Sequence, residues 1–141
     1  QGSVWTPVSQ IVTHDATADL GRAIFLKDDL LAISSTSANA SVHIFLVNAE
    51  EGGGVDLQPV CSLAAGVDTT STDSFGISLD GERSTLSDSA VVLIGDANNN
   101  LNWIVQIDFS AATPCRADHV QNFGTSGQAW GSDLFGASVA Y

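Results

Sequence analysis

The chain has 141 residues, 44% of them apolar, so it is long enough to bury the core of one domain of ordinary size. Its 16 acidic residues against 4 Lys and Arg give a formal net charge of −12. This charge excludes nucleic acid and anionic membranes as expected partners, since both are bound through clustered cations. No apolar run approaches the roughly 20 residues that cross a bilayer, so no membrane insertion is expected. The chain begins at Gln1 and has no Met, which predicts a processed chain or a piece of a longer one.

One short pattern occurs three times: an acidic residue, an apolar residue, a glycine and then an alternating strand-like run. Its copies are Asp19–Leu26, Asp73–Leu79 and Asp133–Val139. The glycines, at positions 21, 76 and 136, are 55 and 60 residues apart. Such spacing is typical of a repeated supersecondary unit that cannot bury its apolar face alone. The sequence therefore predicts two full repeats, flanked by the tail of an earlier one and the head of a later one.

Each full repeat contains four short runs of alternating or β-rich residues separated by turn residues, which predicts four strands. In chain order, the expected strands are Trp5–Val12, then Leu20–Lys27, Leu30–Ser34, Val42–Asn48 and Leu57–Leu63, then Phe75–Leu79, Ala90–Ile94, Asn102–Phe109 and His119–Phe123, and finally Leu134–Tyr141. No helix is expected, because the content of Gly, Ser, Thr, Asn and β-branched residues opposes one.

These runs resemble the FG-GAP-type β-propeller repeat of integrin α-subunits. The resemblance rests on Trp5–Val12 leading into Asp19-Leu20-Gly21, followed by Leu30–Ser34 and Val42–Phe45. Leu20 replaces the family's Phe, and Ser34-Ser35 and Gly95-Asp96 stand where the family has Gly-Ala-Pro.

The resemblance implies an all-β fold of four-stranded antiparallel propeller blades. It makes residues 20–63 blade one and residues 75–123 blade two. Residues 1–12 become the outer strand of a preceding blade, and residues 134–141 the first strand of a third. Propellers need 4–8 blades to close, so this chain cannot close a ring by itself.

The segment Asp80–Asp88, between the first two strands of repeat two, alternates oxygen-bearing side chains that can surround a hard cation. Integrin-type repeats carry a similar calcium loop at this place. The resemblance implies the ligands Asp80, Glu82, Ser84, the carbonyl of Leu86, and Asp88. Thr85 stands where the family prefers Gly and Arg83 adds a positive charge, so a longer polar hairpin without Ca²⁺ is the alternative. A second polar segment, Asp96–Asn102, is expected to be a turn.

Cys61 and Cys115 are the only cysteines, and their spacing fits no zinc or redox motif. A disulfide is expected, with two free buried thiols as the alternative. In the blade interpretation the pair spans the two blades, and a bond within one chain or between chains stays open. Asn39-Ala40-Ser41 is an N-glycosylation sequon in a polar loop, which predicts an N-linked glycan on Asn39. With the acidic surface, these features predict a secreted, extracellular protein.

Enzymatic activity is not expected. The chain has no nucleophile elbow, no His-Glu-x-x-His and no phosphate-binding glycine loop. Its histidines, His14, His43 and His119, are scattered along the sequence. The three tryptophans could stack on sugars, but large apolar residues in repeats are more often packing anchors.

The first hypothesis for function is therefore a structural subunit of a secreted extracellular assembly, most simply a filament. Its partners would be copies of itself, joined by strand addition between Leu134–Tyr141 of one copy and Trp5–Val12 of the next. Such head-to-tail contacts make a ring when the rotation closes and a helical fibre when it does not. The alternative is a fragment of a longer extracellular propeller that binds other proteins or glycans as an adhesion module. An unrelated β-sandwich subunit is a third possibility.

Overall fold

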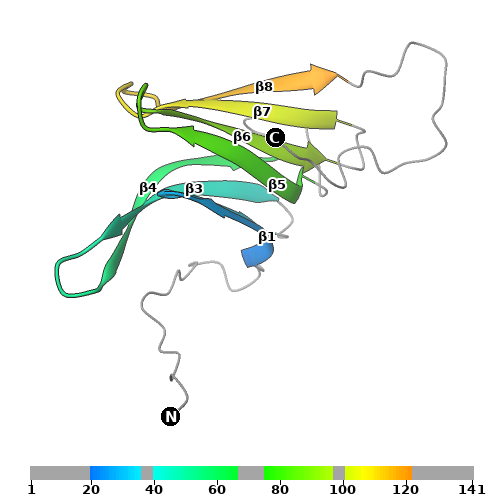
Figure 1. The fold of residues 1–141 in the computed structure, drawn as a ribbon. Coiled ribbons are helices and arrows are strands. Elements are labelled where there is room, and N and C mark those ends of the chain that lie inside the picture. Colours follow the sequence, from blue (N-terminus) through cyan, green and yellow to red (C-terminus); the bar gives the residue numbers. More distant parts are fainter. Residues whose placement is uncertain (1–19, 36–39, 67–74, 97–100, 122–141) are drawn as a thin grey trace, which may run out of the picture.

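The computed structural model describes residues 20–35, 40–66, 75–96 and 101–121. These residues form eight strands in two four-stranded antiparallel sheets, each a simple meander (Figure 1). Sheet one contains β1 (Leu20–Lys27), β2 (Leu30–Ser35), β3 (Ser41–Ala49) and β4 (Val55–Ala64). Sheet two contains β5 (Phe75–Ser84), β6 (Ser89–Asp96), β7 (Leu101–Asp108) and β8 (Cys115–Gln121). The prediction of an all-β chain with two four-stranded antiparallel sheets is confirmed.

Several predicted features lie outside the described residues. They are the terminal strands Trp5–Val12 and Leu134–Tyr141, the sequon residue Asn39, the tryptophans Trp5 and Trp130, and His14.

Both sheets begin with the same irregularity, which explains the repeated glycine. A step of four residues on the first strand, Leu20 to Ile24 or Phe75 to Leu79, faces a step of two residues on the second strand. The glycine after the first residue of each bulge has a positive φ, 94° at Gly21 and 79° at Gly76. Only Gly adopts this conformation without steric cost, so the backbone of the bulge requires it.

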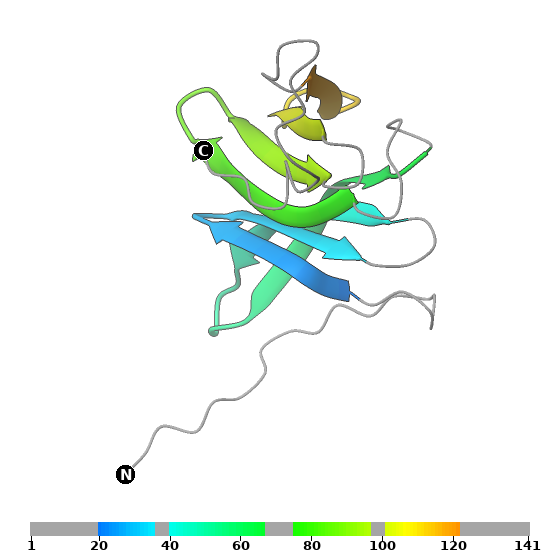
Figure 2. The same ribbon diagram turned by 90° about the vertical axis from the view of Figure 1, so that its right-hand side faces the viewer.

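The sheets pack face to face, as two layers that both views show (Figures 1 and 2). The shared core contains Phe25, Ala32, Val42 and Ile44 from sheet one and Phe75, Val92, Ile94, Trp103 and Val105 from sheet two. The first strands β1 and β5 are in contact, and the last strands β4 and β8 are joined by a disulfide. Sheet two is therefore stacked on sheet one with its strands in the same order.

Most strand boundaries lie within two residues of the sequence prediction, and two differ by more. β5 continues to Ser84 instead of ending at Leu79, and β8 begins at Cys115 instead of His119. The extension of β5 lacks apolar alternation because Gly81 lies beneath the Phe25 ring and Arg83 enters a polar cluster. This part of the strand pairs residue by residue with β6 in a hairpin, and its polar sequence does not reveal it.

Candidate functional site

The segment expected to bind calcium is a β-hairpin. Asp80, Glu82 and Ser84 lie on β5, and Leu86 and Asp88 lie in the turn that precedes β6. The Asp80 carboxylate accepts the Gly81 N–H at 2.8 Å.

The other oxygen-bearing side chains of this hairpin also have protein partners. Glu82 pairs with Lys27, the Ser84 and Ser87 hydroxyls are 2.8 Å apart, and Asp88 pairs with Arg83. Among the described residues, no group of three or more His, Cys, Asp or Glu side chains is arranged to hold a metal ion. The calcium site stays a prediction.

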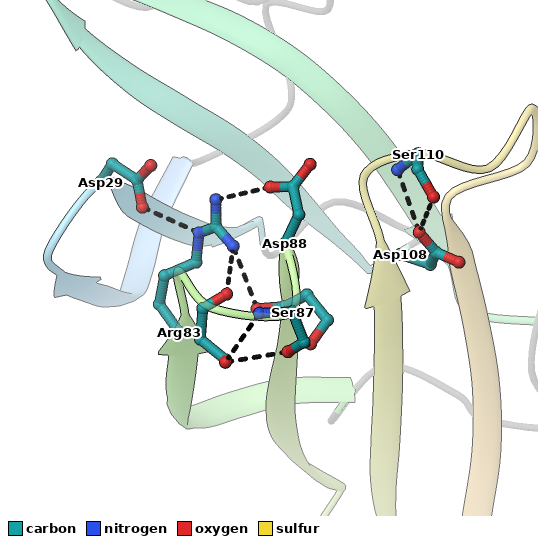
Figure 3. A network of polar contacts seen from close by, with 8 residues as sticks. Asp29, Arg83, Ser87, Asp88, Asp108 and Ser110 are labelled. Atoms are coloured by element: carbon teal, nitrogen blue, oxygen red, sulfur yellow. Dashed lines mark hydrogen bonds and ion pairs between the residues drawn. The ribbon is translucent and has the colours of Figure 1, made fainter.

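Arg83 is the centre of the polar cluster at this end of the molecule (Figure 3). Its Nε donates to Asp29 Oδ1 at 3.0 Å, and its Nη2 donates to Asp88 Oδ1 at 3.0 Å. Its Nη1 donates to the carbonyls of Ser84 and Ser89 at 2.8 and 3.1 Å. Because Asp29 lies in the turn between β1 and β2, the guanidinium joins sheet two to sheet one.

The Arg83 side chain is only 6% exposed, and its guanidinium lies 4.3 Å from the centre of the Phe109 ring. Burial opposes the charged form, but the hydrogen bonds and charges of Asp29 and Asp88 outweigh it. The pKa of Arg83 is consequently raised above its ordinary value. Arg83 is therefore charged at neutral pH.

The predicted disulfide is confirmed: Cys61 on β4 is bonded to Cys115 on β8 within one chain, with a Cα–Cα distance of 6.4 Å. The described residues contain no free cysteine. A structural disulfide of this kind indicates an oxidising compartment, because cytosolic thiols are kept reduced.

A row of polar side chains crosses sheet one. The Ser35 and Ser41 hydroxyls are 2.8 Å apart, His43 Nε2 lies 3.0 Å from Ser41 Oγ, and His43 Nδ1 lies 2.7 Å from Ser62 Oγ. Burial lowers the pKa of His43, so the neutral ring is favoured. With both ring nitrogens held by hydroxyls, the row links β2, β3 and β4.

The face of sheet one that points away from sheet two carries apolar side chains beside the polar row of Ser35, Ser41 and His43. We call it the outer face of sheet one and define it by Ile24, Leu26, Leu31, Ile33 and Phe45, which are cross-strand neighbours or alternate along a strand. Ile24 and Leu26 on β1 are 63% and 61% exposed. Leu31 and Ile33 are buried but do not belong to the core between the sheets. Ile24 and Leu26 thus form a small exposed apolar patch along β1.

The repeat shows what the outer face of sheet one corresponds to. Counted from the two bulge glycines, Ile24 matches Leu79 and Leu26 matches Gly81. In sheet two this face packs against sheet one: an ideal Cβ on Gly81 would lie 3.4 Å from Phe25 Cε1. The two sheets therefore meet through different faces, and the face that sheet two buries against its neighbour is the face that sheet one exposes.

Trp103 lies in the shared core at 3% exposure, with its ring edge-to-face against Phe75 at a centroid distance of 6.4 Å. It acts as a packing anchor in sheet two.

The roles of Arg83 and of the exposed residues Ile24 and Leu26 were not predicted from the sequence. The signal for the latter was present in the repeat, which aligns Leu26 with a glycine. The alignment is explained by the contact between Phe25 and Gly81, which are more than fifty positions apart in the chain.

No protein-family model, curated protein or solved structure matches the chain. Among the described residues, no helix has the length and hydrophobicity to cross a membrane.

Proposed function

We propose that the protein is a structural subunit of a secreted extracellular assembly, built by head-to-tail association of propeller-like repeats. One observation carries the proposal: two equivalent sheets stack in the same sense, and the face that would complete the stack is exposed along β1 of sheet one. Repeating the operation that relates sheet one to sheet two would place another sheet on this face.

A contact between unlike faces is heterologous and can be extended from copy to copy. Such contacts give a ring when the rotation closes and an open helical array when it does not. Four-stranded antiparallel sheets stacked face to face are also the blades of a propeller, which is the fold that the FG-GAP resemblance implies. In this proposal each chain contributes two blades, and its terminal strands join blades shared with neighbouring copies.

Secretion is part of the proposal. The disulfide between β4 and β8 is compatible with an oxidising exterior, and an N-linked glycan on Asn39 would add solubility there. A formal net charge of −12 keeps unassembled copies apart in dilute solution, since like charges repel. Assembly would then strengthen with ionic strength, because salt screens this repulsion.

The experiment is to express the chain through a secretory pathway and measure its mass by light scattering over a concentration series, with particle images of the largest species. We expect mass to rise with concentration and salt, and images to show rings or fibres. A chain that is monomeric at every concentration and salt tested would contradict the proposal. A monomer that instead captures extracellular proteins or glycans would favour the alternative, an adhesion module cut from a longer propeller.

Calcium remains a proposed cofactor of the Asp80–Asp88 hairpin. To bind there with Asp88 as a ligand, the ion has to displace the Arg83 guanidinium from that carboxylate. Thermal unfolding in Ca²⁺ and in EDTA tests the idea: a higher Tm in Ca²⁺, abolished by Asp88→Asn, would support it. Equal Tm values in the two buffers would contradict it.

A further inference from the structure

We propose that the outer face of sheet one receives residues 134–141 of a second copy, lying against β1 as β1 lies against β5. The inference depends on the proposed assembly and names the contact that would produce it. Its occupant is the third copy of the glycine pattern, Leu134–Tyr141, which the sequence predicts to be the strand that follows sheet two in repeat order.

The junction between the two sheets provides the template. The Phe25 ring from sheet one lies over Gly81: an added Cβ there would be in van der Waals contact with Phe25 Cε1 at 3.4 Å and would overlap the Val91 carbonyl of its own sheet. Beside it, Gly76 lies so close to sheet one that its Cβ would be 2.7 Å from Ser34 Cβ and 3.0 Å from Val42 Cγ2. A large side chain on the first sheet therefore fills the space above a small residue on the second.

On the outer face of sheet one, Gly21 and Leu26 stand at the positions that Gly76 and Gly81 have in sheet two. Gly21 is exposed and has the same backbone conformation as Gly76, yet the nearest described neighbour of its added Cβ is Ile24 Cδ1 at 3.7 Å. Among the described residues, no other sheet approaches Gly21 in the way that sheet one approaches Gly76. Leu26 occupies the position of Gly81, so here the large residue is on the receiving face.

The size of the incoming residue follows from the repeat. Four positions after their glycines come Phe25, Asp80 and Ala140. Where large Phe25 meets small Gly81, small Ala140 would meet large Leu26, and the combined volume is preserved. Conservation of total volume is what close packing demands.

The same comparison rejects a direct contact between sheet two of one copy and sheet one of another. That contact would place the Asp80 carboxylate over Leu26, burying a charge against an apolar side chain at a large energetic cost. In repeat order Asp80 is instead matched with Tyr141 of its own chain, whose hydroxyl can donate a hydrogen bond to a carboxylate. All three junctions of the repeat are then complementary.

The test uses two variants with one added cysteine each, Leu26→Cys and Ala140→Cys, mixed and mildly oxidised with the Cys61–Cys115 bond intact. Because each chain carries one added thiol, a bond between positions 26 and 140 can form only between copies. We expect this disulfide by mass spectrometry. The matched control pairs Ala140→Cys with Leu86→Cys, a fully exposed position at the tip of the β5–β6 turn, and should give no bond.

A second measurement tests volume complementarity. Ala140→Leu should weaken association at least about tenfold, because overpacking a close contact is costly. Adding Leu26→Ala in the same chain should restore association to within about threefold, as volume-conserving swaps are tolerated. Rescue of this kind would not occur if either residue acted only by stabilising its own chain.

The outcomes separate this inference from the proposed function. Assemblies that form without a 26–140 bond, or that bond equally through position 86, overturn the inference and leave the assembly proposal standing. A doubly substituted chain that closes the 26–140 bond within itself shows the segment to be its own occupant and also overturns the inference. A chain that never assembles contradicts the proposed function itself.

Discussion

Arg83 places a full charge on a side chain that is 6% exposed, while its partners Asp29 and Asp88 are 39% and 62% exposed. Losing the ion pairs would therefore cost the buried guanidinium more solvation energy than it would cost the two carboxylates, which water can reach. Its hydrogen bonds to two carbonyls and two carboxylates account for its burial, as buried charge must be paired.

Arg83→Met should lower the free energy of unfolding by about 2–3 kcal/mol, from lost charged hydrogen bonds partly offset by the retained apolar stem. Urea unfolding followed by fluorescence measures the change. The control is Arg116→Met, whose side chain is 76% exposed in its pair with Asp118 and should leave stability nearly unchanged. Equal effects of the two variants would show that the cluster does not join the sheets.

His43 predicts a dependence of stability on pH. Burial lowers its pKa in the folded state, so the unfolded state takes up the proton at a higher pH. The contribution of His43 is fully present above its unfolded pKa of about 6.5 and declines as pH falls through and below that value. Unfolding free energies at pH 7.5 and pH 5 should fall further in the natural chain than in His43→Gln. If both chains lose the same amount, His43 is not the titrating group.

The elements show why the repeat needs its glycine. Gly21 and Gly76 occupy equivalent bulges in sheets one and two, but of the two only Gly76 is in close contact with the other sheet. The effect of the positive φ and the effect of close contact between the sheets can therefore be measured separately, at Gly21 and at Gly76.

Gly21→Ala should cost about 1–2 kcal/mol in an unassembled chain, the strain of a left-handed Ala. Gly76→Ala should cost about 1–3 kcal/mol more, because its Cβ would overlap Ser34 and Val42. Thermal and urea unfolding at low protein concentration compare the two. Similar losses would mean that the sheets separate easily enough to admit a methyl group.

The strands were predictable where side-chain alternation reflects burial. Leu20–Lys27 and the turn at Asp28-Asp29 were predicted with their observed bounds, because alternating apolar residues meet a tight turn there. The end of β5 was not predictable, since Asp80–Ser84 reads as a polar loop. Its small and charged residues are explained by contacts with sheet one, which a local pattern does not contain.

The candidate interaction surface was only partly predictable. An unfinished array was expected from the repeat, but the sequence could not say which residues its open face exposes. Ile24 and Leu26 read as ordinary strand residues until the stacking of the sheets shows that, at the same positions of sheet two, Leu79 packs against the shared core and Gly81 is buried. The disulfide was predictable as a pair because only two cysteines are present.

At the scale of the whole molecule, the disulfide joins the last strands of both sheets across a sequence separation of 54. Closing a loop of this size restricts the unfolded chain by about 4 kcal/mol in the chain-entropy model. Replacing both residues, Cys61→Ala with Cys115→Ala, should lower the free energy of unfolding by about 2–4 kcal/mol. Urea unfolding of oxidised, reduced and substituted chains measures this. Unchanged stability after reduction would mean that the core alone fixes the stack.

The stacking of sheet two on sheet one through unlike faces gives any array built by the same operation a direction. One terminus of such a polymer presents Ile24 and Leu26, and the other presents the opposite surface of the repeat. The two termini are chemically distinct, so they elongate at different rates and accept different caps. A copy carrying Leu26→Asp could still add at one terminus and would then block further growth there, acting as a chain terminator of defined polarity.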